Sequence, residues 1–513
     1  MHSYTLREKF RMYLICLTLT ALCFILIGWS LHIRRSMSYW QRRGVPGPKI
    51  SFLTGIFPKS FYGKCSIIEE LHELYLQYKS SQKFVGVMRG FCPKIFVLHP
   101  ALAAEILKPS FSNFYDNEAS QWTSAEVEQL RVCSPFVSTG RSWKERRAEL
   151  TPALTLSRLR AFYSTMHESA AKLIAHLESH HSTDTLDVKE LAHRFTADFM
   201  AKFIWSVEAE AFSSATPGPI HKMGNAMVTQ GTKCVRFFEL TGFCPWLRKL
   251  HSVPFFPQQS DRFFTALTQS ALITRTDHRR IDRNDAIDYF LQLRSRKPVK
   301  DLQISGHTTT MLIDGFETAA VLIAHCLLLL SRNPRVQAKL RAELLDCEVN
   351  ELTFETLNTL LYLDQCIQET LRIFPPLALF SKLCTNPTKL CTGEQDAIEV
   401  VKDDVVYISA YSFHHDAEFF ENPEHFWPER FDAQFGGVQK YREMGVFLPF
   451  GDGPRMCLGM KLGLLEAKVA VAEVVKHFQV NCSECTRKDN KISSNDFLTS
   501  LDGGIRLLFE KLI

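Results

Sequence analysis

One cysteine in this 513-residue chain has a setting that is typical of chemistry. Cys457 lies in the stretch FLPFGDGPRMCLGMKLG, between Arg455 and Gly459, directly before a predicted helix. A thiol near a helix N-terminus and close to a cation is favoured as thiolate, and N–H groups of a glycine-rich turn tune its electron density. Most lone cysteines are small buried side chains. The pattern F-x-x-G-x-R-x-C-x-G, which Phe450 and Gly453 complete, instead indicates a functional thiolate.

A second stretch, MLIDGFETAA, places Asp314 and Glu317 in an apolar run, where a carboxylate is costly unless it is paired or protonated. One interpretation is a D-G hairpin turn between two strands. The flanking runs TTTMLI and AAVLIAHCLLLL are too long and do not alternate, so we predict a helix over 301–330, about 45 Å long. The spacing i, i+3, i+4 puts both acids and Thr318 on one face of that helix.

Two further pairs have helical spacing. Glu369 and Arg372 in ETLR are three residues apart, which for an ordinary surface ion pair contributes about 0.2–0.5 kcal/mol. Trp143 and Arg147 in WKERR are one helical turn apart, and a solvated basic helix face would not explain the tryptophan.

Taken together, these motifs resemble those of a cytochrome P450, particularly the membrane-anchored microsomal kind found in insects. The resemblance extends from near Arg42 to the C-terminus. It implies a single large haem-binding domain, haem b (iron protoporphyrin IX) as cofactor, and Cys457 as the axial ligand of the haem iron. A thiolate in that position favours O–O cleavage of bound dioxygen.

The resemblance also implies roles for residues around the haem. Arg430 in PERF joins Glu369 and Arg372 in a buried triad behind the haem. The Cys457 loop, with Phe450, Gly453, Arg455 and Gly459, holds the cofactor.

Two haem propionates need cationic partners. The resemblance implies that Trp143 and Arg147 contact one of them, through an indole N–H and a forked guanidinium. Lys382 in SKLCT stands where the family usually has an arginine for the other propionate. Since lysine is a point charge, we expect a looser contact.

On the other haem face, Glu317 and Thr318 match the acid–threonine pair that relays protons to oxygen at the haem, and Gly315 gives a place where the helix can open. Asp314 departs from the family, which nearly always has alanine or glycine there. Three arrangements are open for it: turned aside to a polar partner, protonated over the haem so that it narrows the substrate pocket, or bound to the ferric iron as a sixth ligand. We favour the second.

Periodicity along the chain indicates a mainly α fold with a minor β-sheet portion. A predicted hairpin (84–100) precedes a mostly helical region (101–375), β-type runs return between 385 and 415, and a loop-rich segment (415–455) leads to a helix.

Proline-containing segments break the helical region. One is TPGP near 216–219 and the other is PFFP at 254–257. Phe255 and Phe256 in the latter either dip into a membrane or pack internally.

The N-terminal segment predicts a membrane anchor. Met12 to Leu31 has no charged residue and is long enough to cross a hydrocarbon core of about 30 Å. Arg34 and Arg35 follow where a cleaved signal would have small residues, and the basic excess after the span favours a cytosolic body. We therefore expect an endoplasmic reticulum membrane protein.

The domain organisation follows from this anchor. We expect a short N-terminal segment (1–11), the anchor (12–31), a basic and proline-rich hinge (32–50) and a catalytic domain (51–513).

Composition agrees with this organisation. Hydrophobic residues make up 46% and charged residues 22%, as in a globular chain, and a net charge of +5 gives no case for nucleic-acid binding. The 39 phenylalanines indicate a large apolar interior or cavity. The 15 cysteines lack framework spacing, which favours a reduced compartment.

The resemblance implies a haem-thiolate monooxygenase. It would insert one oxygen atom of O2 into an apolar small molecule (xenobiotic, steroid or fatty-acid-like), with electrons from NADPH through NADPH–cytochrome P450 reductase or cytochrome b5. Lys440, Arg442 and Lys461 are either a basic docking face for such a donor or solvated surface charge.

Two other functions remain open. One is a reductase-independent haem-thiolate isomerase or dehydratase of oxygenated lipids. The other is a haem-binding protein with little catalysis. No motif identifies the substrate.

Overall fold

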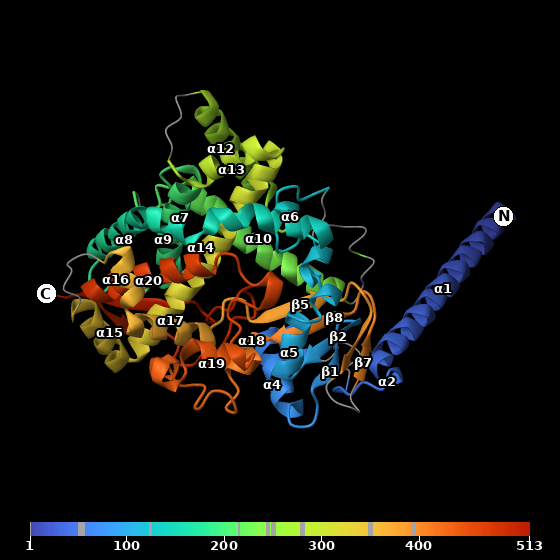
Figure 1. Ribbon diagram of the computed structural model, residues 1–513. Helices are drawn as coiled ribbons and strands as arrows, with labels where there is room; N and C mark the ends of the chain where they lie inside the picture. The colour runs from blue at the N-terminus through green and yellow to red at the C-terminus, as the bar shows by residue number, and fades with distance from the viewer. Residues whose placement is uncertain are drawn as a thin grey trace.

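The computed structural model describes residues 2–49, 57–122, 126–213, 216–242, 247, 253–277, 283–346, 352–391 and 397–512 (Figure 1). The α-helices are α1 His2–Met37, α2 Tyr39–Arg42, α3 Pro58–Phe61, α4 Ile67–Tyr78, α5 Pro100–Leu107, α6 Gly140–Leu150, α7 Leu156–Ala161, α8 Tyr163–Glu178, α9 Val188–Trp205, α10 Pro219–Thr241, α12 Gln258–Asp277, α13 Ala286–Arg296, α14 Asp301–Arg332, α15 Pro334–Asp346, α16 Phe354–Thr359, α17 Leu361–Ile373, α18 Ala410–His414, α19 Gly437–Glu443 and α20 Met460–His477. The strands are β1 Phe84–Arg89, β2 Cys92–Val97, β3 Asp116–Asn117, β4 Leu186–Asp187, β5 Leu379–Leu383, β6 Thr388–Cys391, β7 Ala397–Val400, β8 Val405–Ser409, β9 Phe478–Cys482 and β10 Arg506–Lys511.

The strands form three small sheets beside a much larger helical part, which confirms the predicted fold class. The largest sheet has the order β1-β2-β8-β5-β3 and lies at one end of the body (Figure 1). The predicted hairpin is confirmed, since Phe84 pairs with Val97 in antiparallel register. The other sheets have the orders β4-β10-β9 and β6-β7.

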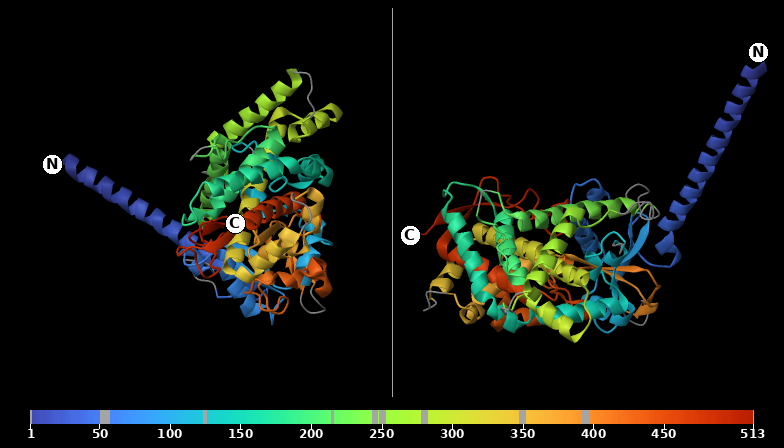
Figure 2. Two further views of the ribbon diagram at one scale, coloured as in Figure 1. Left: turned by 90° about the vertical axis from the view of Figure 1, so that its left-hand side faces the viewer. Right: turned by 90° about the horizontal axis from the view of Figure 1, so that it is seen from above.

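Helix α14 runs through the helical part and is the element that positions the candidate site (Figures 1 and 2). Most of its side chains are buried, because an apolar run without alternation buries every side of a helix. The helix predicted over 301–330 is confirmed, and the hairpin-turn alternative is excluded. Helix α9 packs along α14, and α20, which follows Cys457, contacts both helices.

Proline sets the boundaries of two helices as predicted. Helix α10 begins at Pro219, and α12 begins directly after Pro257. Proline is tolerated at a helix start because its missing N–H would have no helical partner there. In the segment between them, Phe256 is 6% exposed and Phe255 packs against the core, so the structure gives these side chains internal contacts.

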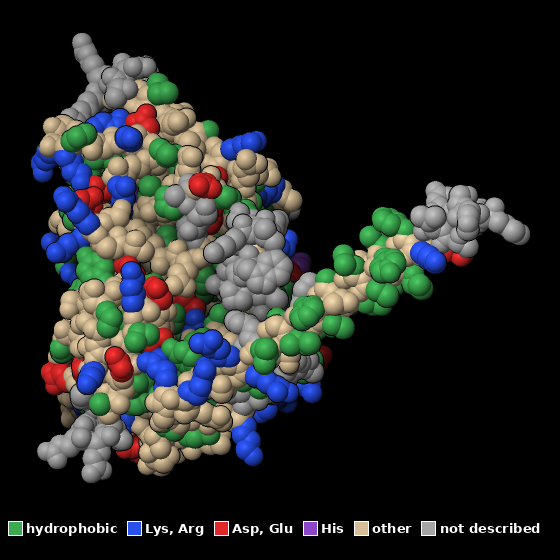
Figure 3. Space-filling model, turned by 90° about the vertical axis from the view of Figure 1, so that its right-hand side faces the viewer, with side chains coloured by type: hydrophobic (Ala, Val, Ile, Leu, Met, Phe, Trp, Pro, Cys, Tyr) green, Lys and Arg blue, Asp and Glu red, His purple; other side chains and the backbone are tan. Residues whose placement is uncertain are grey.

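Helix α1 projects from the body, and hydrophobic side chains cover it (Figure 3). The window Glu8–Met37 is long and apolar enough to span a membrane and is not buried in the protein. The second helix that passes the same test is α14, whose window is 78% buried as a core helix. The apolar N-terminal helix is thus of the kind that anchors a protein to a membrane.

The segment expected as a hinge is attached to the large sheet. The indole N–H of Trp40 donates to the carbonyl of Val87 at 2.9 Å, and Arg43 forms an ion pair with Asp404 at 3.2 Å. A Cβ on Gly47 would lie 2.3 Å from the carbonyl oxygen of Gly86, so only glycine allows this approach. Residues 40–47 therefore fix the base of α1 against β1.

Candidate functional site

Cys457 lies in the loop that leads into α20. Its N–H donates to the carbonyl of Phe450 at 2.9 Å, which closes the loop. Gly453 has φ +68°, and a Cβ there would lie 2.0 Å from the carbonyl oxygen of Leu107. Both conditions require glycine. The loop is thereby pressed against α5, which fixes the position of the thiol.

The environment of the Cys457 thiol contains opposing electrostatic effects. Burial raises its pKa to about 11, and the negative charge of Asp314 adds to this rise. The N–H of Gly459, which donates to the sulfur, and the cation of Arg147 both lower the pKa. Without a metal ion the protonated thiol is therefore favoured. Coordination of a metal ion would stabilise the thiolate.

Asp314 of α14 lies near enough to Cys457 for its negative charge to raise the pKa of the thiol. Both side chains have accessible surface, although burial raises the pKa of each, that of Asp314 to about 7. The two observations agree if both side chains line an interior cavity rather than the outer surface. Thr318, one turn later, donates from Oγ1 to the carbonyl of Asp314 at 2.5 Å.

Glu317 points away from this cavity toward α9. Its carboxylate oxygens lie 2.8 Å from Nζ of Lys189 and 2.5 Å from Nε2 of His193. Burial alone would raise the pKa of Glu317, but these two partners lower it to about 2. Asp314, Glu317 and Thr318 share one side of α14 as their spacing predicts, but the side chain of Glu317 turns to its partners on α9, which packs against α14.

Gly315 has a packing role that the sequence did not indicate. A Cβ at this position would lie 2.8 Å from Cε of Met200 on α9. The absence of a side chain therefore lets the two helices approach closely. Its expected role, an opening of the helix beside the cofactor, stays a prediction.

Four polar residues form a group that we call the cation cluster: Trp143, Arg147, Lys382 and Arg455. Arg455 lies over the Trp143 ring at 4.5 Å. Burial, and to a lesser degree the charge of Arg147, lower the pKa of Arg455 to about 10. Burial and the charge of Arg455 likewise lower the pKa of Lys382 to about 7.

The members of the cation cluster differ in how well their donors are satisfied. Arg455 donates to the carbonyls of Tyr115, Pro135 and Ser138 and to Asp116. Lys382 donates to Asn117 at 2.9 Å.

In the described part of the chain, the buried indole N–H of Trp143 has no hydrogen-bond partner, and none contacts the guanidinium of Arg147. Unpaired donors among mutually repelling cations require an anion, and the carboxylates of haem fit this requirement. The residues present therefore fit haem, with Cys457 as a soft ligand for its iron.

Glu369, Arg372 and Arg430 come together as the resemblance implied, and we call this group the triad. Arg372 donates to both oxygens of Glu369 at 2.8 Å, and Arg430 donates to the same carboxylate at 3.0 Å. Arg372 also donates to the carbonyls of His414 and Pro423. All three side chains are at most 2% exposed. The triad ties α17 to the loop before Cys457.

Several residues at the site escaped the sequence reasoning. Asp116 and Asn117, which hold Arg455 and Lys382, belong to the two-residue strand β3. So short a strand has no periodicity to read. Lys189 and His193 of α9 belong to an ordinary amphipathic helix, and only the fold brings them to Glu317.

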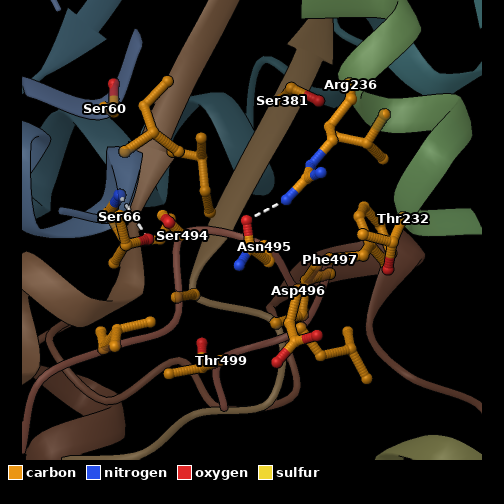
Figure 4. Close-up of a pocket in the computed structure, with 18 of the residues that line it drawn as sticks. Ser60, Ser66, Thr232, Arg236, Ser381, Ser494, Asn495, Asp496, Phe497 and Thr499 are labelled. Atoms are coloured by element: carbon orange, nitrogen blue, oxygen red, sulfur yellow. Dashed lines mark hydrogen bonds between the residues drawn. The ribbon is translucent and has the colours of Figure 1, made fainter. Parts of the chain in front are cut away.

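A second cavity, of about 120 Å³, lies between α10, β5 and residues 494–499 (Figure 4). Its walls mix polar and apolar side chains, and Arg236 and Asn495 form a hydrogen bond across it (Figure 4). Neither Cys457 nor Asp314 lines this cavity.

The fold and the site define a haem-thiolate protein. The family model of cytochrome P450 matches residues 48–507. The chain is 37% identical to probable cytochrome P450 28a5 of Drosophila melanogaster, over 98% of this chain and 100% of the relative. It is 34% identical to probable cytochrome P450 28d1 (95% and 96%) and 27% identical to cytochrome P450 6a2 (95% and 97%), both from the same organism.

The chain therefore belongs to the cytochrome P450 family. It is an oxidoreductase, a haem-thiolate monooxygenase that uses O2 and electrons from a redox partner.

Proposed function

We propose that this monooxygenase is anchored in the endoplasmic reticulum membrane and oxidises an apolar small molecule, xenobiotic, steroid or fatty-acid-like, with its domain in the cytosol. Electrons come from NADPH through NADPH–cytochrome P450 reductase, with cytochrome b5 as a second donor. The observation that carries the proposal is the buried indole N–H of Trp143, which has no hydrogen-bond partner among the described residues and lies beside Arg147 and Arg455, near Cys457. The apolar α1 and the 39 phenylalanines support the membrane and the apolar substrate.

The residues have distinct tasks in this proposal. Haem b, when bound, supplies the oxygen-activating chemistry. Cys457 is the thiolate ligand, the donors of Trp143, Arg147 and Lys382 hold the propionates, and Arg455 braces the loop beside them.

On α14, the hydroxyl of Thr318 donates to the backbone carbonyl of Asp314 and is the threonine of the proposed proton relay. Glu317, ionised between Lys189 and His193, accepts a proton from these partners and passes it through water toward the cavity.

The proposal is tested first by haem ligation. The reduced, CO-bound wild type should show the absorption band of a thiolate-ligated haem, and Cys457→Ser should lose it. Cys482→Ser is the matched control, because Cys482 is an exposed free thiol outside the site. A band of unchanged position in Cys457→Ser would refute the assignment.

The electron source is tested by oxidation of NADPH in a reconstituted membrane with the reductase. Substrate-dependent consumption supports the proposal. Its dependence on salt tests whether Lys440, Arg442 and Lys461 form a docking face, because screening weakens electrostatic steering. Reduction that is independent of salt would contradict such a face.

A second function is favoured by Asp314 alone. An acid inside the cavity could protonate an oxygenated lipid, so that rearrangement or dehydration proceeds without a reductase. Product formation from a lipid hydroperoxide without NADPH would support it, and strict dependence on NADPH excludes it.

A further inference from the structure

Asp314 is an exposed residue in the middle of α14, where its neighbours Leu312 and Phe316 are buried in the core. Cys457 likewise has accessible surface, and the negative charge of Asp314 raises the pKa of the Cys457 thiol, so the two side chains lie near each other. Asp314 is thus an acid inside the substrate space and not on the outer surface.

No hydrogen-bond or ion-pair partner contacts this carboxylate in the part of the chain that the structure describes. The nearby hydroxyl of Thr318 donates its hydrogen bond to the backbone carbonyl of Asp314 and not to the carboxylate. Glu317, on the same helix, has two cationic partners. The fold therefore pairs one buried acid of α14 and leaves the other open to a ligand.

Arg131 is the cation that acts on Asp314, but it is committed elsewhere. Its charge lowers the pKa of Asp314 against the larger effect of burial. The guanidinium forms an ion pair with Glu128 at 3.5 Å and stacks on the ring of Phe255 at 3.8 Å. Arg131 thus favours the ionised form of Asp314 but forms no hydrogen bond with its carboxylate oxygens.

We propose that the substrate is an apolar molecule that carries a protonated amine, and that Asp314 receives its ammonium group. This inference rests on the proposed function and names the substrate class of the same cavity. A buried carboxylate without a partner is costly, and a full positive charge with an N–H donor compensates it better than a neutral group does. The apolar part of the ligand would occupy the rest of the cavity.

The experiment compares two probes of equal shape on the haem-loaded, full-length enzyme in lipid nanodiscs. N-methyl-4-phenylpiperidine carries the charge, and 1-methyl-4-phenylcyclohexane is its neutral counterpart. Isothermal titration calorimetry gives Kd for each probe with the wild type, Asp314→Asn and Asp314→Ala. We expect the ratio of the two Kd values to change by roughly 30-fold between wild type and Asp314→Asn, with the amine losing affinity.

Asp301→Asn is the matched control. Asp301 lies on the same helix at its exposed start, where it pairs with Arg294. It removes one negative charge of α14 outside the cavity and should leave the ratio unchanged. An equal fall of amine affinity in this control would overturn the proposal, since the effect would then be a general one of charge.

Two further outcomes overturn the inference while the proposed function stands. One is an unchanged Kd ratio in Asp314→Asn. The other is a ferric Soret band that differs between ligand-free wild type and Asp314→Ala, because Asp314 would then be bound to the iron and not free for a ligand. Failure of the proposed function is distinguishable, since it appears in Cys457→Ser and in NADPH consumption.

Discussion

The triad and the cation cluster are two groups of charged side chains inside the fold, and they differ in whether their members have counter-charges. In the triad, the carboxylate of Glu369 accepts from both guanidinium groups. In the cation cluster, the carboxylate of Asp116 contacts Arg455. The side-chain N–H groups of Trp143 and Arg147 have no hydrogen-bond partner in the described part of the chain. A group with its own counter-charge stabilises the fold, and a group that lacks one is prepared for a ligand.

The largest effect is expected from removing the counter-charge of the triad. Glu369→Ala leaves two buried guanidinium groups unpaired, which should cost about 3–5 kcal/mol of the free energy of unfolding. Urea denaturation of the purified protein measures this loss. Glu73→Ala, at an exposed pair with Lys59, is the control and should cost at most about 1 kcal/mol. An equally small loss in the free energy of unfolding for both variants would contradict a structural role of the triad.

Arg455 belongs to the cation cluster, but each nitrogen of its guanidinium donates to a protein acceptor, as in Arg372 of the triad. Arg455→Lys loses most of the four hydrogen bonds to Tyr115, Pro135, Asp116 and Ser138, since a lysine cannot fork. We expect a loss of about 2–3 kcal/mol in the free energy of unfolding of the haem-free protein. An effect seen in haem affinity alone would place Arg455 with the ligand-binding donors instead.

Trp143→Phe tests a donor that has no protein partner. The ring packing against Arg455 remains, and only the N–H is lost, so the haem-free protein should keep its free energy of unfolding. Haem affinity should fall by roughly 10- to 100-fold if the N–H donates to a propionate, because hydrogen bonds to charged groups contribute about 1.5–3 kcal/mol. Titration of haem into the haem-free variant and wild type measures this affinity. Unchanged affinity would contradict the propionate contact.

The smallest effect concerns pH and Lys382. Its pKa is lowered to about 7 in the folded protein, against about 10.4 in the unfolded chain, so the unfolded state binds more protons between these values. The free energy of unfolding of the haem-free protein should therefore rise with pH from about 7 to 10. A propionate restores the charge, so haem binding takes up a proton, and haem affinity should fall by up to about tenfold per pH unit above about pH 7.

Lys382→Arg is the variant that separates this effect from others. An arginine stays charged over the whole pH range, so the haem affinity of the variant should lose most of its dependence on pH. The same dependence in both proteins would show that another group titrates.

The two acids of α14 show where sequence reasoning was insufficient. Periodicity correctly predicted the helix, and the cost of burying a carboxylate correctly indicated that Asp314 and Glu317 needed an explanation. Helical spacing placed both on one side of the helix. The structure separates their side chains, because Glu317 turns to Lys189 and His193 of α9. Partners on a distant helix leave no local signal.

The cation cluster gives the same lesson for the candidate site. Trp143, Arg147, Lys382 and Arg455 were recognisable from their motifs. The residues that hold them, Asp116 and Asn117, lie in a strand too short to have a pattern. Pairing with β5 brings Asn117 to Lys382, and the loop before Cys457 brings Arg455 to Asp116.

The amino-acid sequence by itself determined the family, the mainly helical fold, the apolar N-terminal helix and Cys457 as a functional thiol, because motifs and periodicity are local properties of the chain. Only the tertiary structure decided which charged side chains have partners. Glu369 and Glu317 each have a counter-charge from another element, whereas no ion-pair partner contacts Asp314 or Arg147 among the residues that the structure describes. The physical reason is that the cost of a buried charge depends on what lies within a few ångströms of it, and folding alone sets those distances.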